Sequence, residues 1–455
     1  MNISVFGLGK LGAPLAAVFA SSGARVIGSD RKPELVALIN RGVAPVEEPG
    51  LAQLIAENRD RLCATTDAAQ AVLASDISFI VVPTPSLADG TFNNRLVIEA
   101  AERIGRALRQ KKGHHVVVVS STVMPGSCDG PITSILEAAS ALRIGSDIGL
   151  CYCPKFIALG SVIHDLTHPD FVLLGASDER AGAIVKDIYL HCCANQPPIL
   201  QMGLVNAEIA KLSVNAYVTM KISFANLLGE VCEAIDGADA ITIASAVGLD
   251  TRIGRKYLQP ALGFGGPCFP RDSIAFAAMA RRVGVEPDLA DATQRINDRQ
   301  ARRIAGILSA RLSSNATVAV LGLTYKPNTP VIERSQSVEI ARLLVEQGFR
   351  VVVHDPTGVG PARAVLGERV RYADTAAAAI AEAQGVLVAT PWPAYRELHK
   401  ALPAGCSITI VDCWHLLDRS ACEAAGADLI QPGRPPAADP SKLPRVADAS
   451  SQRSG

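Results

Sequence analysis

A glycine-rich turn near the N-terminus constrains the fold of this chain more than any other feature. An apolar run at residues 3–6 leads into Gly7-Leu8-Gly9-Lys10-Leu11-Gly12, and an alanine-rich, helix-like stretch follows. In such a pattern the first glycine makes the tight turn, the second lets the backbone approach a pyrophosphate, and the third lets the helix pack on the strand. The helix N-terminus then faces the phosphates. The alternative is a tight turn with spare glycines; we predict a dinucleotide-binding turn whose six residues contact the cofactor.

The carboxylate that follows the next strand indicates which dinucleotide binds. Residues 23–30 read as a second strand that ends at Asp30. A carboxylate there accepts hydrogen bonds from the adenosine ribose and repels a 2′-phosphate, which favours NAD over NADP. Arg31 and Lys32 follow directly and weaken that preference. FAD is a further alternative that nothing else in the chain favours.

Strand-like and helix-like segments alternate on both sides of a helical middle. Apolar runs return, with helical stretches between most of them, at residues 77–83, 116–121, 148–153 and 171–175. A similar unit begins at residues 316–322 and continues into residues 348–355, which echo residues 23–30. This alternation predicts an α/β fold with two Rossmann-like doubly wound parallel-sheet domains joined by a central helical region.

The middle of the chain predicts one long helix. Residues 205–236 are rich in Ala, Leu, Ile, Glu and Lys, with one glycine and no proline. A helix this apolar is either the spine of the molecule or a subunit contact. We expect an NAD-binding domain at residues 1–200, a helical dimerisation and active-site domain at residues 201–312, a C-terminal Rossmann-like domain at residues 313–432 and a disordered tail at residues 433–455.

The composition sets limits on partners and location. The chain has 455 residues, and its 44 Lys and Arg balance its 44 Asp and Glu, so its charge gives no support for a nucleic-acid or anionic-membrane partner. No apolar run reaches the ~18–20 residues of a membrane span, and the chain begins as a strand rather than a signal peptide. The eleven cysteines lack the spacing of a metal site. We therefore expect no metal, mostly reduced and buried thiols, and a cytoplasmic location.

The segment from Leu262 to Asp272 carries the clearest chemical signal. It reads Leu-Gly-Phe-Gly-Gly-Pro-Cys-Phe-Pro-Arg-Asp, and Pro270 is a good first residue of a helix. Cys268 then precedes a helix N-terminus and neighbours Arg271, and both features favour the thiolate. A lone cysteine is usually a small buried hydrophobe, but here the glycines leave room for a ligand. We predict that Cys268 is a nucleophile.

Four polar residues share one face of the long predicted helix. Glu208, Lys211, Asn215 and Thr219 are spaced i, i+3, i+7 and i+11, with apolar residues elsewhere. This spacing is typical of a solvated polar stripe, so periodicity by itself gives these residues no chemical role.

Several further sequence blocks occur in a fixed order, which is hard to obtain by chance. They are Val46-Glu-Glu-Pro-Gly-Leu51, Val82-Pro-Thr-Pro85 with Asp89-Gly90, Ser121-Thr-Val-Met-Pro-Gly126, Ala207-Glu-x-x-Lys211-x-x-x-Asn215, Asp250-Thr-Arg-Ile-Gly254, Gly263-Phe-Gly-Gly-Pro-Cys268, Tyr325-Lys-Pro-Asn-Thr329 and His354-Asp-Pro356. Together they resemble the UDP-glucose/GDP-mannose dehydrogenase family over about residues 1–420.

The resemblance implies a reaction and roles for particular residues. A primary alcohol on a nucleotide-linked sugar is oxidised twice to a carboxylate with two NAD, through an aldehyde, a cysteine thiohemiacetal and a thioester that water hydrolyses. An NAD domain, a central domain that forms a homodimer, and a C-terminal domain for the nucleotide of the sugar are implied. Mapped onto this chain, Cys268 is the nucleophile, and Lys211 and Asn215 stabilise oxyanions. Asp272 and Thr122 position water or assist proton transfer.

The resemblance also implies the binding residues. Those that match the family's NAD contacts are Gly7, Gly9, Gly12, Asp30, Thr84 and Thr122. Those expected at the sugar nucleotide are Lys155, Phe156, Lys211, Asn215, Gly263, Phe264, Gly265 and Lys326. Arg252 matches an arginine that reaches the substrate of the neighbouring subunit.

One segment departs from the family pattern. Where the family usually has Pro-Glu-Phe-Leu-x-Glu-Gly, this chain has Pro-Lys-Phe-Ile-Ala-Leu-Gly, so Lys155 and Leu159 replace two carboxylates, the first of which is the family's candidate base for hydrolysis. Phe171 replaces an arginine and Leu227 a glutamate. A cation at Lys155 predicts attraction of an anionic group, a substrate that differs from UDP-glucose near the oxidised carbon, and slow or rerouted hydrolysis. The alternatives are a two-electron oxidation and a non-catalytic nucleotide-binding homologue.

Overall fold

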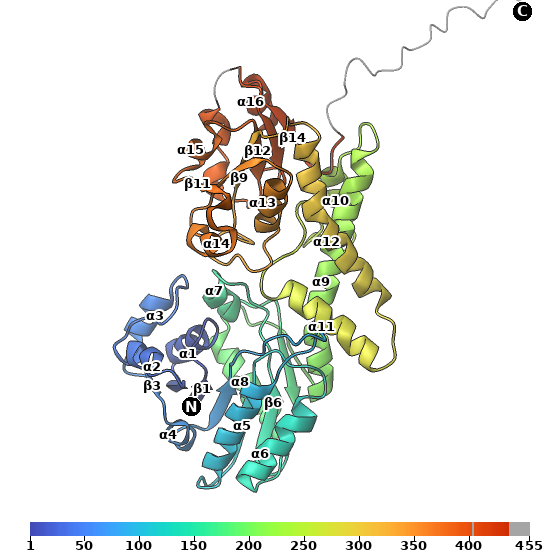
Figure 1. The fold of residues 1–455 in the computed structure, drawn as a ribbon. Helices are drawn as coiled ribbons and strands as arrows, with labels where there is room; N and C mark the ends of the chain where they lie inside the picture. Colours follow the sequence, from blue (N-terminus) through green and yellow to red (C-terminus); the bar gives the residue numbers. More distant parts are fainter. Residues whose placement is uncertain (403–404, 436–455) are drawn as a thin grey trace, which may run out of the picture. The chain divides into compact units, whose positions relative to one another are not determined.

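The chain divides into two compact units, each with its own sheet (Figure 1). The computed structural model describes residues 1–402 and 405–435. The first unit comprises Met1–Tyr217 and Arg271–Ala290, and the second comprises Val218–Pro270 and the chain from Asp291 onward. Because the chain crosses between the units more than once, the helical middle is shared by both.

The first unit is built on an eight-stranded sheet. Its strands are β1 Asn2–Phe6, β2 Arg25–Ser29, β3 Leu62–Thr65, β4 Ile77–Ile80, β5 His115–Val119, β6 Ile148–Tyr152, β7 Val172–Ala176 and β8 Ile199–Met202. They lie in the order β3-β2-β1-β4-β5-β6-β7-β8. All neighbours are parallel except β6 and β7. The chain order reverses between β1 and β4, which is the switch point where doubly wound sheets bind ligands.

Helices cover both faces of this sheet. One face carries α1 Gly12–Ser21, α2 Pro33–Asn40, α3 Leu51–Glu57, α7 Val162–Thr167 and α8 Glu179–Cys192. The other carries α4 Ala68–Leu73, α5 Arg95–Leu108 and α6 Thr133–Ser140, with a single π-helical turn, η1 Cys128–Ile132, before α6. Val118 packs in the first core, while Val117 and Val119 pack in the second. Strands buried on both faces explain the continuous apolar runs in the sequence.

The long helix predicted at residues 205–236 is α9, Leu204–Glu233. At 1.5 Å per residue it is about 45 Å long. It begins in the first unit and ends in the second. Three more helices follow: α10 Ala240–Val247, α11 Phe269–Arg282 and α12 Asp288–Ser309. Asp239 caps α10, because its carboxylate accepts the N–H groups of Ile241 and Thr242. The prediction of a helical middle is confirmed.

The second unit contains a six-stranded parallel sheet. Its strands are β9 Thr317–Leu321, β10 Arg350–His354, β11 Arg371–Tyr372, β12 Gly385–Val388, β13 Thr409–Asp412 and β14 Asp428–Ile430, in the order β11-β10-β9-β12-β13-β14. Its helices are α13 Gln336–Glu346, α14 Val359–Leu366, α15 Ala376–Ile380 and α16 Arg419–Ala424, with short 3-10 turns η2 Gly367–Arg369, η3 Pro393–Tyr395 and η4 Leu398–Ala401. The prediction of two Rossmann-like sheets is confirmed.

The end of the described chain stays in contact with the second unit. The N–H of Gly433 donates to Glu233, and Arg434 pairs with Asp239 at 3.0 Å. These two residues lie where the sequence predicted the start of a disordered tail; the rest of that prediction, from residue 436 on, lies outside the described residues.

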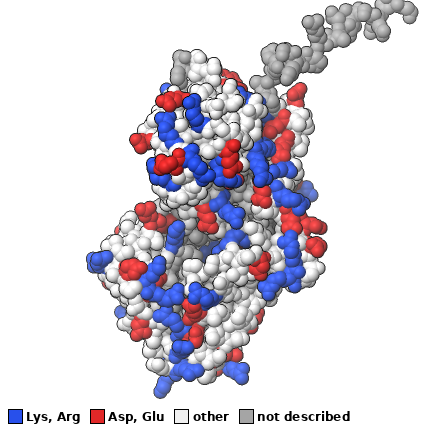
Figure 2. All heavy atoms as spheres, viewed as in Figure 1, with Lys and Arg blue, Asp and Glu red and all other residues white. Residues whose placement is uncertain are grey.

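Two surface properties bear on possible partners. Of the helices in the described ranges, none combines the length and the apolar character that crossing a membrane requires. Figure 2 shows acidic and basic side chains interspersed over the visible face, in keeping with their equal numbers.

Candidate active site

The turn between β1 and α1 has the geometry of the predicted dinucleotide fingerprint. Gly7 has φ +98°, and a Cβ there would lie 2.3 Å from the carbonyl oxygen of Val81. A Cβ at Gly12 would lie 1.8 Å from the carbonyl oxygen of Gly7, whereas a Cβ at Gly9 would meet nothing within 4 Å. The chain's own packing therefore requires the first and third glycines, and the second leaves open space for a ligand. Leu8 is buried, Leu11 is half-buried, and Gly9 and Lys10 are exposed on that side.

Asp30 lies beside this turn, directly after β2. Its two carboxylate oxygens accept the N–H of Leu8 at 2.8 Å and the N–H of Lys32 at 2.9 Å. These contacts fix the carboxylate next to the site of the predicted ribose. Arg31 pairs with Glu99 on α5 at 2.9 Å, so its guanidinium is engaged away from a 2′-phosphate. The residues present fit NAD better than NADP.

Two further predicted cofactor residues meet at the carboxyl ends of β4 and β5. The Thr84 hydroxyl donates to the carbonyl oxygen of Thr122 at 2.7 Å. Thr84 is buried, and Thr122 is half-buried on the loop after β5. Glu208 of α9 fixes this loop, because its carboxylate accepts the N–H of Gly126 at 2.6 Å and the N–H of Cys128 at 2.8 Å. Burial raises the pKa of Glu208.

The polar face of α9 is buried, so the solvated stripe favoured by periodicity alone is wrong. Glu208 and Thr219 are fully buried, and Lys211 and Asn215 are 5% and 6% exposed. The Asn215 amide donates to Oδ2 of Asp272 at 2.7 Å, and Lys211 Nζ lies 4.0 Å from the same oxygen. Asp272, on the first turn of α11, is 1% exposed. The structure therefore brings three predicted catalytic side chains of the first unit into one buried network.

Lys211 has two more partners in the segment that follows β6. Its Nζ donates to the carbonyl oxygen of Lys155 at 3.0 Å and lies 4.4 Å from the centre of the Phe156 ring. The ring of Phe156 in turn packs on Phe171, with centroids 5.0 Å apart. A carbonyl dipole and an aromatic face both stabilise an ammonium.

The side chain of Lys155 has different partners from its carbonyl. The ammonium donates to the Tyr189 hydroxyl, lies 4.1 Å from the centre of that ring, and is 3.2 Å from Cys153 Sγ. Tyr189 and Cys153 are both buried. This placement gives no support to an anionic group bound by Lys155, which stays a prediction.

Cys268 belongs to the second unit and is one of two exposed cysteines. It directly precedes α11, as predicted, and α11 begins one residue earlier than Pro270 suggested. None of the eleven cysteines forms a disulfide, and eight are buried. Arg271, expected to favour a Cys268 thiolate, pairs with Asp272 at 3.3 Å and donates to the carbonyl oxygen of Thr84. That Cys268 is a thiolate stays a prediction.

The glycine segment before Cys268 fits tightly within the second unit. A Cβ on Gly263 would lie 2.4 Å from Asn297 Oδ1, and one on Gly265 would lie 2.4 Å from the carbonyl oxygen of Arg334. Asn297 also accepts the Phe264 N–H at 2.6 Å and donates to its carbonyl. Lys326 lies half-buried on the loop that follows β9, the loop that also supplies Arg334.

Arg252 lies on the loop that follows α10. It is exposed and pairs with Asp250 at 2.6 Å. Its loop is fixed by Lys221 of α9, whose Nζ donates to the carbonyl oxygens of Ile253 and Gly254, each at 3.0 Å.

Known proteins resemble this chain along almost its whole length. Three family models match: the UDP-glucose/GDP-mannose dehydrogenase NAD binding domain at residues 1–193, the central domain at residues 205–299 and the UDP binding domain at residues 319–419. The chain is 36% identical to UDP-glucose 6-dehydrogenase AglM of Haloferax volcanii over 423 residues, 92% of this chain and 98% of that one.

The chain belongs to the UDP-glucose/GDP-mannose dehydrogenase family. GDP-mannose 6-dehydrogenase of Azotobacter vinelandii is 32% identical over 420 residues, 89% of this chain and 95% of that one. The structure of a UDP-glucose dehydrogenase from Pyrobaculum islandicum aligns with a TM-score of 0.86 at 37% identity, covering 95% of this chain and 98% of that one. Membership makes the chain an NAD-dependent nucleotide-sugar dehydrogenase and NAD its cofactor.

The carboxylate that follows the second strand of each sheet, Asp30 in the first unit and Asp355 in the second, has different partners in the two units. Asp355 follows β10 as Asp30 follows β2, but its oxygens accept seven hydrogen bonds from its own unit. The donors include the N–H groups of Leu323 and Gly358 and the indole N–H of Trp392. A carboxylate so fully satisfied has little capacity left for a ribose.

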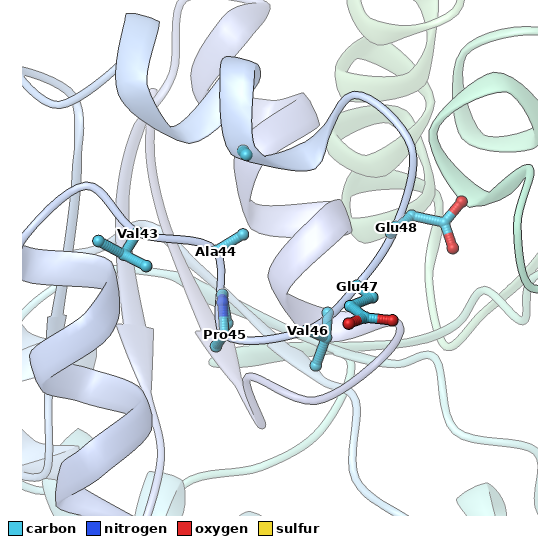
Figure 3. A pocket seen from close by; sticks show the side chains of 7 residues that line it. Val43, Ala44, Pro45, Val46, Glu47 and Glu48 are labelled. Carbon is cyan, nitrogen blue, oxygen red and sulfur yellow. The ribbon is translucent and has the colours of Figure 1, made fainter. Parts of the chain in front are cut away.

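Two carboxylates that hold loops of the first unit were assigned no role from the sequence. One is Glu208, whose only signal was its place on the polar face of α9. The other is Glu48, beside a 430 Å³ hollow lined by residues 43–48 and Ala52 (Figure 3). Glu48 points away from the hollow and accepts the N–H groups of Gly160 and Val162. It thereby fixes the far end of the segment that contacts Lys211.

Among the described residues, no three His, Cys, Asp or Glu side chains are arranged to hold a metal ion.

Proposed function

We propose that this dehydrogenase oxidises the primary alcohol of a nucleotide-linked sugar to a carboxylate through two covalent intermediates on Cys268. In each oxidation NAD accepts a hydride and the substrate loses one proton. The Cys268 thiol adds to the aldehyde and gives a thiohemiacetal, and the second oxidation turns this into a thioester. Water then hydrolyses the thioester, which releases the acid and returns the thiol.

The buried network of Lys211, Asn215 and Asp272 is the observation that carries this proposal. A buried ammonium and amide stabilise the oxyanion that develops at the carbonyl carbon, because desolvation strengthens both interactions. Asp272 holds the Asn215 amide at 2.7 Å and follows Cys268 by four residues. In this proposal Thr122, whose carbonyl oxygen accepts the Thr84 hydroxyl, assists proton transfer.

In this proposal residues 1–200 bind NAD, residues 201–312 supply the dimer contact and active-site residues, and residues 313–432 hold the nucleotide. Gly263, Phe264, Gly265 and Lys326 contact the substrate. The enzyme works in the cytoplasm, where thiols stay reduced.

The reaction is tested by measuring NADH formed per substrate consumed, with UDP-glucose, GDP-mannose and other nucleotide sugars. Two NADH per substrate support the four-electron reaction. One NADH supports a two-electron oxidation, and none with any substrate supports a non-catalytic homologue.

A second candidate is an oxidation that stops at the thioester, and the replacement of a family carboxylate by Lys155 favours it. An ammonium does not take a proton from water. Slow hydrolysis predicts a rapid burst of NADH and a substrate adduct on Cys268 by intact mass. Fast turnover of UDP-glucose without an adduct contradicts this candidate and the prediction of an altered substrate.

We also propose that two copies associate through α9. Within the second unit, Phe224, Leu227 and Val231 of α9 are 51%, 39% and 48% exposed, and Ile235, two residues after the end of α9, is 54% exposed. These four residues recur every three or four positions. Such an apolar stripe favours a helix partner. Arg252 then serves the site of the partner subunit. Mixing the inactive variants Arg252→Ala and Cys268→Ser should restore part of the activity, because one site of each mixed dimer carries both native residues; no recovery contradicts this role.

A further inference from the structure

The segment after β6 is fixed from inside by a lysine. The Lys155 ammonium donates to the hydroxyl of Tyr189 on α8 and lies 3.2 Å from Sγ of Cys153, the residue that follows β6. Burial raises the pKa of Tyr189, so the phenol stays neutral and accepts this hydrogen bond. A partly buried ammonium needs such partners, because an unpaired one is costly to desolvate.

The other side of the same segment holds the ammonium of Lys211. The carbonyl oxygen of Lys155 accepts Lys211 Nζ at 3.0 Å, and the ring of the next residue, Phe156, lies 4.4 Å from it. The hydrogen bond and the ring contact of Lys211 therefore both depend on the position of residues 155 and 156. The far end of the segment is held by Glu48, which accepts the N–H groups of Gly160 and Val162.

We propose that Lys155 is a positioning residue for Lys211: its bond to Tyr189 fixes the segment whose carbonyl and ring orient the Lys211 ammonium. The role of Lys211 in the reaction rests on the proposed function. The hydrogen bond from Lys155 to Tyr189, called the anchor below, does not. Because a displacement of about 1 Å at a catalytic group can cost up to ~100-fold in rate, loss of the anchor should lower kcat more than it changes KM.

Hydrogen exchange tests the anchor on the intact protein. Lys155→Met keeps the length of the stem and removes the ammonium, and Tyr189→Phe keeps the ring and removes only the hydroxyl. Both variants should accelerate exchange at the N–H groups of residues 158–162. The control is Lys111→Met: the Lys111 ammonium also donates to buried carbonyls, those of Val72 and Ser75, and its loss should leave residues 158–162 unchanged.

Kinetics test the consequence for Lys211. With whichever of UDP-glucose and GDP-mannose the wild type oxidises, Lys155→Met and Tyr189→Phe should each lower kcat by about tenfold with KM nearly unchanged. The double variant should be no slower than the slower single variant, because both changes break one anchor. The Lys111→Met variant should keep the wild-type kcat.

Three results would overturn the proposal. Unchanged exchange at residues 158–162 in both variants means that Lys155 does not fix the segment. A raised KM with an unchanged kcat means that Lys155 contacts the substrate instead. Multiplicative losses in the double variant mean that Lys155 and Tyr189 act separately. If the wild type oxidises no nucleotide sugar, the proposed function fails, and the exchange measurement still decides the anchor.

Discussion

A histidine buried in the first sheet should make the stability of this protein depend on pH. His115, in β5, is 1% exposed, and its Nε2 forms a 2.8 Å hydrogen bond with the hydroxyl of Ser78. That hydroxyl is also 2.7 Å from Ser4 Oγ. Burial, followed by the neighbouring charge of Lys111, lowers the pKa of His115 from 6.5 to about 3. The imidazole is therefore neutral in the folded protein.

The sign and size of the effect follow from the two protonation states. Above pH 6.5 both the folded and the unfolded chains carry a neutral His115, so its ionisation contributes nothing. Between pH 6.5 and about 3 only the unfolded chain binds the proton, so the free energy of unfolding decreases as the pH falls. At pH 5, which is about 1.5 units below the pKa of 6.5 in the unfolded chain, protonation of the unfolded chain lowers the free energy of unfolding by ~2 kcal/mol.

Urea unfolding of the wild type and of His115→Gln at pH 7, 6 and 5 measures this contribution. The variant loses packing at every pH, but its free energy of unfolding should decrease by ~2 kcal/mol less than that of the wild type between pH 7 and pH 5. The control is His191→Gln, because His191 is exposed at the end of α8, and it should keep the wild-type slope. Equal slopes for the wild type and His115→Gln would refute the assignment of the acid sensitivity to His115.

Four further results are expected. Because of Asp30, NAD should bind at least about tenfold more tightly than NADP, and titration of both cofactors measures it. Cys268→Ser should still bind NAD but form no acid, and an alkylating reagent should label Cys268 fastest, since of the eleven cysteines only Cys63 is also exposed. Glu208→Gln should destabilise the loop after β5 by about 1–3 kcal/mol and weaken NAD binding, because glutamine replaces one of the two accepting oxygens by an NH2 group, which cannot accept an N–H. Val231→Glu should reduce the molar mass in light scattering from a dimer to a monomer.

Features set by neighbouring residues were predictable from the sequence. The turn from Gly7 to Gly12 was recognisable because its backbone requirements are local. The long helix was predicted at residues 205–236 and found at 204–233, because an uninterrupted run of helix formers leaves few other conformations. The sheets followed from alternating apolar runs and helices.

Features that depend on distant partners were not predictable. Periodicity placed Glu208 on a polar face but could not show what covers that face. Its partners, Gly126 and Cys128, lie 82 and 80 residues earlier in the chain. The direction of the Lys155 side chain depends on Tyr189, which lies 34 residues later in the chain, on α8. The family resemblance supplied roles for such positions, but only where the residue itself matches the family.

Two of the departures from the family pattern, Lys155 and Phe171, bear together on the proposed hydrolytic step. Lys155 stands in place of a carboxylate, and its ammonium donates a hydrogen bond to the Tyr189 hydroxyl within the first unit. Phe171 stands in place of an arginine and packs on Phe156. Neither change supplies a base for water. Asp272 is the buried carboxylate nearest in sequence to Cys268, but its oxygens already accept hydrogen bonds from Asn215 and Arg271. A water molecule would have to share Asp272 with these donors. We therefore expect Lys155, in place of the family's carboxylate, to slow hydrolysis of the proposed thioester rather than either oxidation.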